Sequence, residues 1–300
     1  MMQLPNNVTI KEVGPRDGLQ NEKTVIATPD KIEWINRLSR TGVRHIEITS
    51  FVNPKWIPPL ADSLEVATGI ARVEGVTYSA LVPNMRGMEG FLKANLDEVA
   101  VFMSATETHN QKNINKSIDE TFPVLKEVID AALQNGKRVR GYVSTVFGCP
   151  YEGRTDVKQA LYVSQKLLDL GIHELSLGDT IGVANPVQVQ QVLEVFLREI
   201  PADRLAMHFH DTRGMALANV LASLQMGLTT FDGALGGLGG CPYAPGASGN
   251  VATDDLVHML HGMGVATGID EAALVASAQF MQDKIGRPLP SHTLQTVNAC

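Results

Sequence analysis

The sequence predicts an α/β protein of the (β/α)8 TIM-barrel class with extra C-terminal helices. Eight short apolar runs of strand character alternate with segments of helical periodicity, and no linker or low-complexity segment separates them. A doubly wound open sheet is the alternative, but the units are near-equal and no GxGxxG turn follows the first run. We expect one domain over residues 1–300, with the barrel at about 8–235 and a glycine-rich loop and helices at 236–300.

The expected strands are apolar runs bounded by polar or turn-forming residues. They lie at residues 8–13, 45–51, 77–82, 99–103, 139–147, 174–177, 205–210 and 229–235. The first expected helix begins at residue 28, and further helices are expected at 61–71, 84–94, 117–134, 155–170, 185–200 and 215–226. The region 253–285 is also helical in pattern, and the residues from Arg287 onward resemble an irregular tail.

Local sequence signals support several helix starts. Thr28 is a plausible N-cap because a proline follows it at the first helical position. Ser117 and Glu120 have the spacing of a capping box, in which each side chain satisfies a backbone N–H of the first turn. Asn185 also precedes a proline and opens an amphipathic segment.

Composition excludes several classes of protein. A formal net charge of −7 argues against a general nucleic-acid partner or an acidic membrane surface. The N-terminus lacks the pattern of a secretory or transit peptide, and no apolar stretch is long enough for a membrane helix. The three cysteines, Cys149, Cys241 and Cys300, are odd in number and lack metal-ribbon spacing. These features favour a reducing compartment, and we expect the protein in the cytoplasm.

Polar side chains follow several expected strands at their carboxyl ends, where functional groups of a TIM barrel gather. The candidates from four of these strands are Arg16, Asp17, Glu47, Asp179, His208 and His210. The glycine-rich segment 236–250, GGLGGCPYAPGASGN, follows the last strand and contains Cys241 and Asn250. We expect all these groups to meet at one mouth of the barrel.

The HxH pair at His208 and His210 predicts a metal site. Residues two apart on a strand point to the same side, as two ligands of one ion must, although either histidine alone is more often structural. Adding Asp17 and Asn250 gives a nitrogen and oxygen donor set that suits Mg²⁺ or Mn²⁺. Asp211 is a rival ligand, but its side chain should point away from the histidine face.

Other polar residues receive structural interpretations. Cys241 by itself would ordinarily be a small buried hydrophobe, but a glycine-rich loop offers it little apolar cover. Lys11 and Glu12 precede the first loop and are interpreted as exposed strand charges. His109, which we expect in a loop after the fourth strand, could lie in the mouth.

Five segments together resemble the 3-hydroxy-3-methylglutaryl-CoA lyase family. They are GPRDGLQNE at 14–22, IEITSFVNPKW at 46–56, LSLGDTIG at 175–182, HFHDTRGMALAN at 208–219 and GGLGGCPYAPGASGNVATDD at 236–255. The resemblance covers nearly the whole chain in the right order. It implies a TIM barrel, a divalent cation, Mg²⁺ or Mn²⁺, and cleavage of the thioester to acetyl-CoA and acetoacetate, in leucine degradation or ketone-body formation.

The resemblance also implies roles for particular residues. Asp17, His208, His210 and Asn250 would bind the metal, and Arg16, Asp17, Glu47, Asp179, His208 and Cys241 would be catalytic. We take Arg16, Gln20, Ser50 and Ser176 as candidate substrate-binding residues. Asp254 departs from the glutamate that relatives are expected to have. The implied partners are an acyl-CoA substrate and a second copy of the chain in a homodimer.

The chemistry of this cleavage explains the residue types. Asp17 or His208 could accept the proton of the substrate hydroxyl, and Arg16 could stabilise the enolate oxygen of the departing thioester. Cys241 is mostly protonated at neutral pH and could donate a proton to the C2 carbanion. We expect its loop to be mobile and to order on ligand binding.

Two other functions are compatible with these residues. A related acyl-CoA condensing enzyme, of the isopropylmalate or homocitrate synthase type, would form the bond instead of breaking it. Those enzymes usually have a further C-terminal domain and lack the signature around Cys241. A barrel that binds metal and acyl-CoA without turnover is the other alternative, although candidates for every catalytic role are present.

Overall fold

In the computed structural model, which describes residues 4–240 and 249–298, eight parallel strands close into a barrel. Each strand pairs with the next in sequence, and the last pairs with the first through the register Thr9 to Thr230. The strands are β1 (Thr9–Glu12), β2 (His45–Ser50), β3 (Thr77–Leu81), β4 (Glu98–Ser104), β5 (Arg138–Ser144), β6 (Glu174–Asp179), β7 (Leu205–Phe209) and β8 (Thr230–Gly233). The predicted TIM barrel is confirmed, and the open-sheet alternative is wrong.

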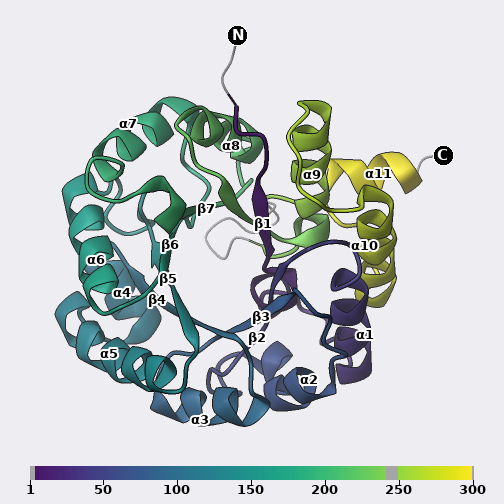
Figure 1. Ribbon diagram of the computed structural model, residues 1–300, viewed down its shortest axis with the longest axis horizontal. Helices are drawn as coiled ribbons and strands as arrows, with labels where there is room; N and C mark the ends of the chain where they lie inside the picture. The colour runs from purple at the N-terminus through teal and green to yellow at the C-terminus, as the bar shows by residue number, and fades with distance from the viewer. Residues whose placement is uncertain (1–3, 241–248, 299–300) are drawn as a thin grey trace.

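The helices form a ring around the strands, and the last three lie beside α1 and β1 (Figure 1). They are α1 (Thr28–Leu38), α2 (Ser63–Gly69), α3 (Met85–Ala94), α4 (Glu107–Ile114), α5 (Ile118–Gln134), α6 (Val157–Asp169), α7 (Pro186–Phe196), α8 (Ala216–Gln225), α9 (Thr253–Gly262), α10 (Glu271–Ile285) and α11 (His292–Asn298). The predicted capping box is present, since Ser117 and Glu120 bond each other's backbone N–H groups at the start of α5. Within the described ranges, no helix is long and apolar enough to span a bilayer.

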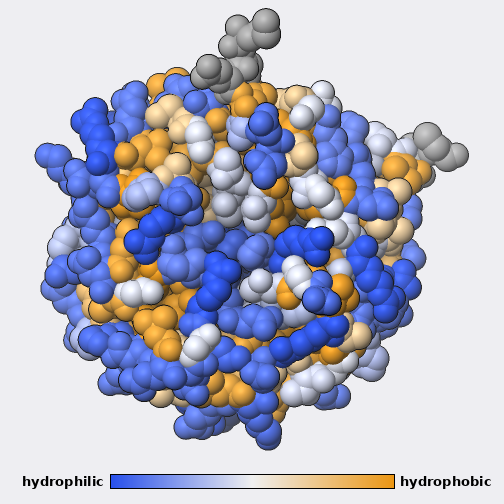
Figure 2. All heavy atoms as spheres, viewed as in Figure 1, coloured by the Kyte–Doolittle hydropathy of each residue, from blue (hydrophilic) through white to orange (hydrophobic). Residues whose placement is uncertain are grey.

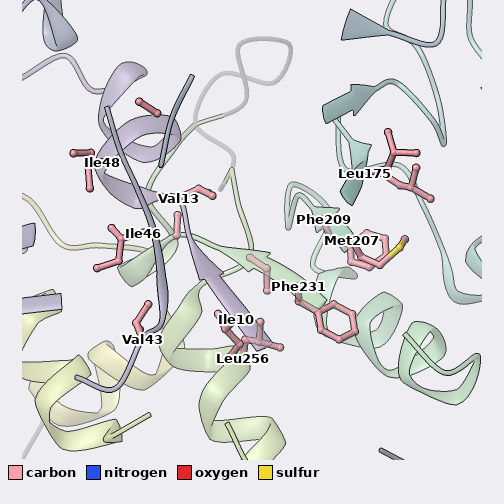
Figure 3. Packing of buried hydrophobic residues seen from close by; sticks show 14 of the residues in the cluster. Ile10, Val13, Val43, Ile46, Ile48, Leu175, Met207, Phe209, Phe231 and Leu256 are labelled. Carbon is pink, nitrogen blue, oxygen red and sulfur yellow. The ribbon is translucent and has the colours of Figure 1, made fainter. Parts of the chain in front are cut away.

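Apolar side chains fill the space between the strands and the helices. Figure 3 shows Met207 and Phe209 of β7 and Phe231 of β8 among these residues, with Leu256 from α9 nearby. Successive strand residues face opposite sides of the sheet. His208, next to Met207 and Phe209, and Asp232, next to Phe231, therefore point into the barrel. Figure 2 shows hydrophilic residues over most of the molecule's outline in this view, with hydrophobic residues scattered among them. The barrel interior is therefore the place where polar groups of several strands meet.

Four expectations about local structure are wrong. Thr28, expected as an N-cap, is the first residue of α1; Ala27 occupies the cap position, and Thr28 Oγ1 donates to Asp62 instead. His109, expected in a loop, lies on the helix α4, and the expected irregular tail contains α11. Lys11 and Glu12, interpreted as exposed charges, are buried. Lys11 forms an ion pair with Glu174 at 2.8 Å, because its side chain points into the barrel, where carboxylates from other strands meet it.

Candidate active site

Three predicted metal ligands meet at the carboxyl end of the barrel. Asp17 lies in a short π-helical turn, η1 (Gly14–Gly18), directly after β1, while His208 and His210 lie on β7 and just beyond it. One ligand atom from each lies within 4.8 Å of the other two. His208 Nε2 is 3.3 Å from His210 Nε2 and 3.7 Å from Asp17 Oδ2. The three side chains therefore present their donor atoms to one common point.

Asn250 lies beside this cluster. It forms an isolated antiparallel bridge with His210, and its Nδ2 donates to Asp17 Oδ2 at 2.8 Å. Its Oδ1 is buried and has no hydrogen-bond partner among the residues that the structure describes. A buried amide oxygen without a partner is costly unless a ligand satisfies it. Oxygen and imidazole donors in this arrangement fit a hard divalent cation such as Mg²⁺ or Mn²⁺.

Asp211 does not belong to this cluster. Its Oδ1 accepts a hydrogen bond from the backbone N–H of Ala216 at 2.9 Å and so supports the start of α8. Its carboxylate is not part of the group formed by Asp17 and the two histidines. The side chain of Asp211 thus lies as expected, turned away from the histidine face.

Neighbouring charges tune the cluster toward cation binding. Burial, together with the adjacent His208, lowers the pKa of His210 to about 4, so the imidazole is neutral at physiological pH and has a free lone pair. Burial by itself would raise the pKa of Asp17. Arg16 and the two histidines outweigh burial and hold the pKa of Asp17 below its usual range. An anionic carboxylate beside a neutral imidazole is the state that binds a cation.

Arg16 is held by carboxylates on both sides. Its Nη1 donates to Asp17 Oδ1 at 2.5 Å, and its Nε donates to Glu47 Oε1. The hydroxyl of Tyr142 donates to the second oxygen of Glu47 at 2.8 Å, and the guanidinium lies 5.4 Å from the centre of the Tyr142 ring. Gln20 Nε2 donates to Asp17 Oδ1 at 2.8 Å. These contacts fix the guanidinium in one place next to the candidate metal ligands Asp17, His208 and His210.

A cavity of about 970 Å³ opens at this end of the barrel. Arg16, Asp17, His208 and His210 lie at one part of its wall, together with Gln20 and Tyr142. Apolar side chains such as Leu81 and Phe102 also line the cavity, and so do Arg86 and Lys116. A mixed polar and apolar cavity of this size can hold a long ligand with an anionic part.

Other predicted site residues do not face this cavity. Asp179 is buried and accepts hydrogen bonds from the backbone N–H groups of Val183 and Ala184, at 2.9 and 3.1 Å. Burial raises the pKa of Asp179 to about 6, although these two bonds lower it. Ser50 and Ser176 are also buried and are not among the lining residues. Of these three, Asp179 holds the turn after β6, directly next to residues that do line the cavity.

The predictions for Cys241 lie outside the described residues. The expected mobility of the loop around Cys241 lies outside them as well. His109, in contrast, lies on α4, lines the cavity and has its Nδ1 2.6 Å from Ser104 Oγ. Burial lowers the pKa of His109. The expectation that His109 belongs to the mouth is therefore confirmed, although it lies on a helix.

Charged groups inside the barrel were not predicted from the sequence. Arg140 of β5 and Asp232 of β8 are buried and joined by a hydrogen bond of 2.6 Å, and Asp232 also contacts His208. Burial by itself would raise the pKa of Asp232, but Arg140 and His208 outweigh it and hold that pKa below its usual range. A signal was present, because a charged residue in the middle of a buried strand must have a partner.

Comparisons with known proteins agree with this geometry. The family model described as HMGL-like matches residues 7–281. A hydroxymethylglutaryl-CoA lyase of Bacillus subtilis is 58% identical over 294 residues, which is 98% of this chain and 98% of the relative. The family suggested by the sequence motifs is therefore confirmed.

Solved structures are similar over nearly the whole chain. The crystal structure of the Bacillus subtilis HMG-CoA lyase has a TM-score of 0.98 at 58% identity and covers 99% of this chain and 100% of that one. An HMG-CoA lyase from Acinetobacter baumannii, in complex with coenzyme A and 3-methylmalate, has a TM-score of 0.93 at 42% identity and covers 98% and 96%. From its barrel, its clustered polar groups and these matches, the chain belongs to the HMGL-like family.

Proposed function

We propose that residues 1–300 act as one catalytic domain that cleaves 3-hydroxy-3-methylglutaryl-CoA to acetyl-CoA and acetoacetate with a bound divalent cation. The observation that carries this proposal is the convergence of Asp17, His208 and His210 beside Arg16, at the wall of one cavity. The names of the relatives support the same carbon–carbon lyase activity.

The cation site consists of Asp17, His208, His210 and Asn250. The unpartnered Asn250 Oδ1 and the neutral His210 support this set. When bound, a divalent cation supplies Lewis-acid polarisation of substrate oxygen atoms. Mg²⁺ and Mn²⁺ are the proposed ions because all four ligands offer a carboxylate or amide oxygen or an imidazole nitrogen, and none is a thiolate.

The chain's own residues carry the proton and the charge. Asp17 accepts the proton of the tertiary hydroxyl as the C2–C3 bond breaks, because His208, with Nε2 on the cation and Nδ1 facing Asp232, has no free lone pair. Arg16, fixed between Asp17 and Glu47, places positive charge where the enolate oxygen of the thioester develops. Because its position is already set before substrate arrives, little reorganisation is needed in the transition state. Cys241 then donates a proton to C2.

Binding of the acyl-CoA uses the rest of the cavity. Leu81 and Phe102 offer apolar surface to the acyl and pantetheine parts, while Arg86 and Lys116 supply positive charge for the phosphates. Glu47 and Asp179 act by holding Arg16 and the turn after β6, since neither faces the cavity. Ser176 is better explained by its contact with Asp232 than by substrate binding.

The proposal also covers the oligomeric state, the location and the pathway. We expect a homodimer in the cytoplasm, acting in leucine degradation or ketone-body formation. Size-exclusion chromatography with light scattering measures the mass directly. A mass near 65 kDa, about twice the 32.4 kDa of the chain, is the expected result.

A product analysis tests the proposed reaction. Metal-depleted protein is incubated with 3-hydroxy-3-methylglutaryl-CoA, with and without Mg²⁺ or Mn²⁺, and acetyl-CoA and acetoacetate are quantified. We expect equimolar products only when the metal is present. Parallel incubation with acetyl-CoA and 2-oxo acids tests the condensing alternative, and release of free CoA there without cleavage in the first assay would replace our proposal by that function.

A further inference from the structure

We infer that Asp232 is a positioning residue that holds the ring of His208 in the orientation and tautomer needed for metal binding. The inference rests on the proposed function, because it concerns one ligand of the same cation site. Asp232 lies on β8, points into the barrel and has a fully buried side chain. It lies on the far side of His208 from the cluster and does not line the cavity.

Among the described residues, the hydrogen-bond partners of this carboxylate come from three other strands. Oδ1 accepts from Arg140 Nη2 of β5 at 2.6 Å. Oδ2 accepts from Ser176 Oγ of β6 at 2.7 Å and lies 3.1 Å from His208 Nδ1 of β7. Because arginine can only donate, it keeps Asp232 in the role of acceptor. The second carboxylate oxygen, Oδ2, can then accept from both the serine hydroxyl and the imidazole.

This arrangement decides which ring nitrogen of His208 is free. A carboxylate oxygen 3.1 Å from Nδ1 favours the proton on that nitrogen, so the lone pair is left on Nε2. Nε2 is the atom that faces Asp17 Oδ2 and His210 Nε2. The Tyr142 ring packs edge-on against the imidazole, with centroids 5.9 Å apart, and limits its rotation. A metal ligand is thus prepared by a carboxylate that does not touch the metal.

Arg140 connects the carboxylate of Asp232 to the residues that hold Arg16. Its three nitrogens each donate to a different residue: Nε to Glu174 at 2.6 Å, Nη1 to the hydroxyl of Tyr142 at 2.7 Å, and Nη2 to Asp232. The same Tyr142 hydroxyl donates to Glu47, which holds Arg16. The orientation of the metal ligand and that of the catalytic guanidinium are therefore set by one buried network.

A purely structural role for Asp232 would have a different signature. If the carboxylate only balanced the buried charge of Arg140, its loss would lower stability but leave the metal affinity of the folded protein unchanged. If it positions His208, its loss must change the ring tautomer and weaken metal binding even in protein that remains folded. Metal affinity and histidine tautomer are therefore the readouts that separate the two roles.

The first experiment compares Asp232→Asn with a matched variant, Ser176→Ala. Ser176 donates to the same Oδ2 atom but does not touch His208, so the control removes one bond of the carboxylate and keeps the other. Binding of Mn²⁺ alone is measured by calorimetry at pH 7.5, without substrate. We expect the Kd to rise about 10–100-fold for Asp232→Asn, the usual effect of losing such a carboxylate, and less than about threefold for Ser176→Ala. Equal Kd values for the two variants would overturn the inference.

A second measurement uses only the unaltered protein, so it does not depend on whether a variant folds. Nitrogen-15 spectra of histidine-labelled, metal-free protein report which nitrogen of each imidazole is protonated. We expect His208 to be protonated on Nδ1, and protonation on Nε2 in the unaltered protein would overturn the inference. Neither experiment uses catalytic turnover, so their outcome is independent of whether the proposed cleavage is observed.

Discussion

At the scale of single residues, Glu12 joins three segments of the chain through one carboxylate. Its Oε1 accepts from the backbone N–H groups of Gly14 and Leu235, at 2.7 and 2.9 Å, and its Oε2 accepts from Thr253 Oγ1 at 2.6 Å. These residues lie in the turn that contains Asp17, after β8, and at the start of α9. One buried side chain thereby fixes the segments on either side of the metal cluster.

This position makes stability depend on pH. Burial raises the pKa of Glu12 from 4.5 to about 7, even though its three hydrogen bonds lower it. A carboxyl group with a raised pKa in the folded state contributes stability that is present below pH 4.5 and is lost as the pH rises through 7. Between pH 5 and 8, the unfolding free energy of the unaltered protein should fall by about 2–3 kcal/mol relative to Glu12→Gln. Urea unfolding measures this difference, and parallel pH curves would refute it.

Cys241 carries the proposed proton donation. Replacing its thiol by the much weaker acid of serine should reduce kcat by about 10²–10⁴ and leave Mn²⁺ affinity unchanged. Cys149→Ser is the control, because Cys149 is buried and its Sγ accepts from Thr106 Oγ1 at 3.2 Å, a contact that a hydroxyl can keep. Steady-state kinetics should show less than about a threefold change for the control. Full activity of Cys241→Ser would assign the proton to another donor.

At the scale of elements, two glycines bring together the ends of the segment 241–248. Gly239 has a φ of +97°, a backbone conformation that residues other than glycine rarely adopt. A Cβ on Gly249 would lie 1.0 Å from the carbonyl oxygen of Gly239, so the two backbones cross without room for a methyl group. The carbonyl of Gly249 accepts from the N–H of Asp211 at 2.7 Å. This crossing sets the position of Asn250 next to His210.

Gly249→Ala should therefore displace Asn250. We expect at least a tenfold rise in the Kd for Mn²⁺ and a comparable loss in kcat/KM, because one ligand moves while the other three stay in place. Gly262→Ala in α9 is the matched control, since no atom lies within 4 Å of its added Cβ. That change should keep activity and stabilise the helix by up to about 1 kcal/mol. Unchanged metal affinity in Gly249→Ala would separate the crossing from the cation site.

At the scale of the whole molecule, barrel closure brings residues from both ends of the chain together. Asp17 and Asn250 are hydrogen-bonded although they are 233 positions apart. This convergence could be predicted from sequence, because parallel strands of a barrel share one carboxyl end and each candidate followed a strand. The closed strand order and the capping box at Ser117 were predictable for the same kind of reason, since each has a local signal.

Other features have no such signal. Helix α4, with the sequence ETHNQKNI, has one apolar residue and so shows no amphipathic period. Helix α11 follows two prolines and is held by Asp255, which accepts from the backbone N–H groups of His292 and Thr293. The contact between Arg140 and Asp232 crosses the barrel, and strand order by itself does not reveal which inward residues meet. Long-range side-chain pairing is the part that the sequence left undetermined.

Cleavage should depend on a cation held by Asp17, His208, His210 and Asn250, and a metal titration of the cleavage rate measures this dependence. Acetyl-CoA release from 3-hydroxy-3-methylglutaryl-CoA is measured against Mn²⁺ concentration for the unaltered protein and His210→Ala, with His258→Ala, whose histidine is exposed, as control. We predict a half-saturating Mn²⁺ concentration about 100-fold higher for His210→Ala, since one ligand is lost, and no change for His258→Ala. Cleavage that proceeds equally without metal, or identical titrations for all three proteins, would contradict the account.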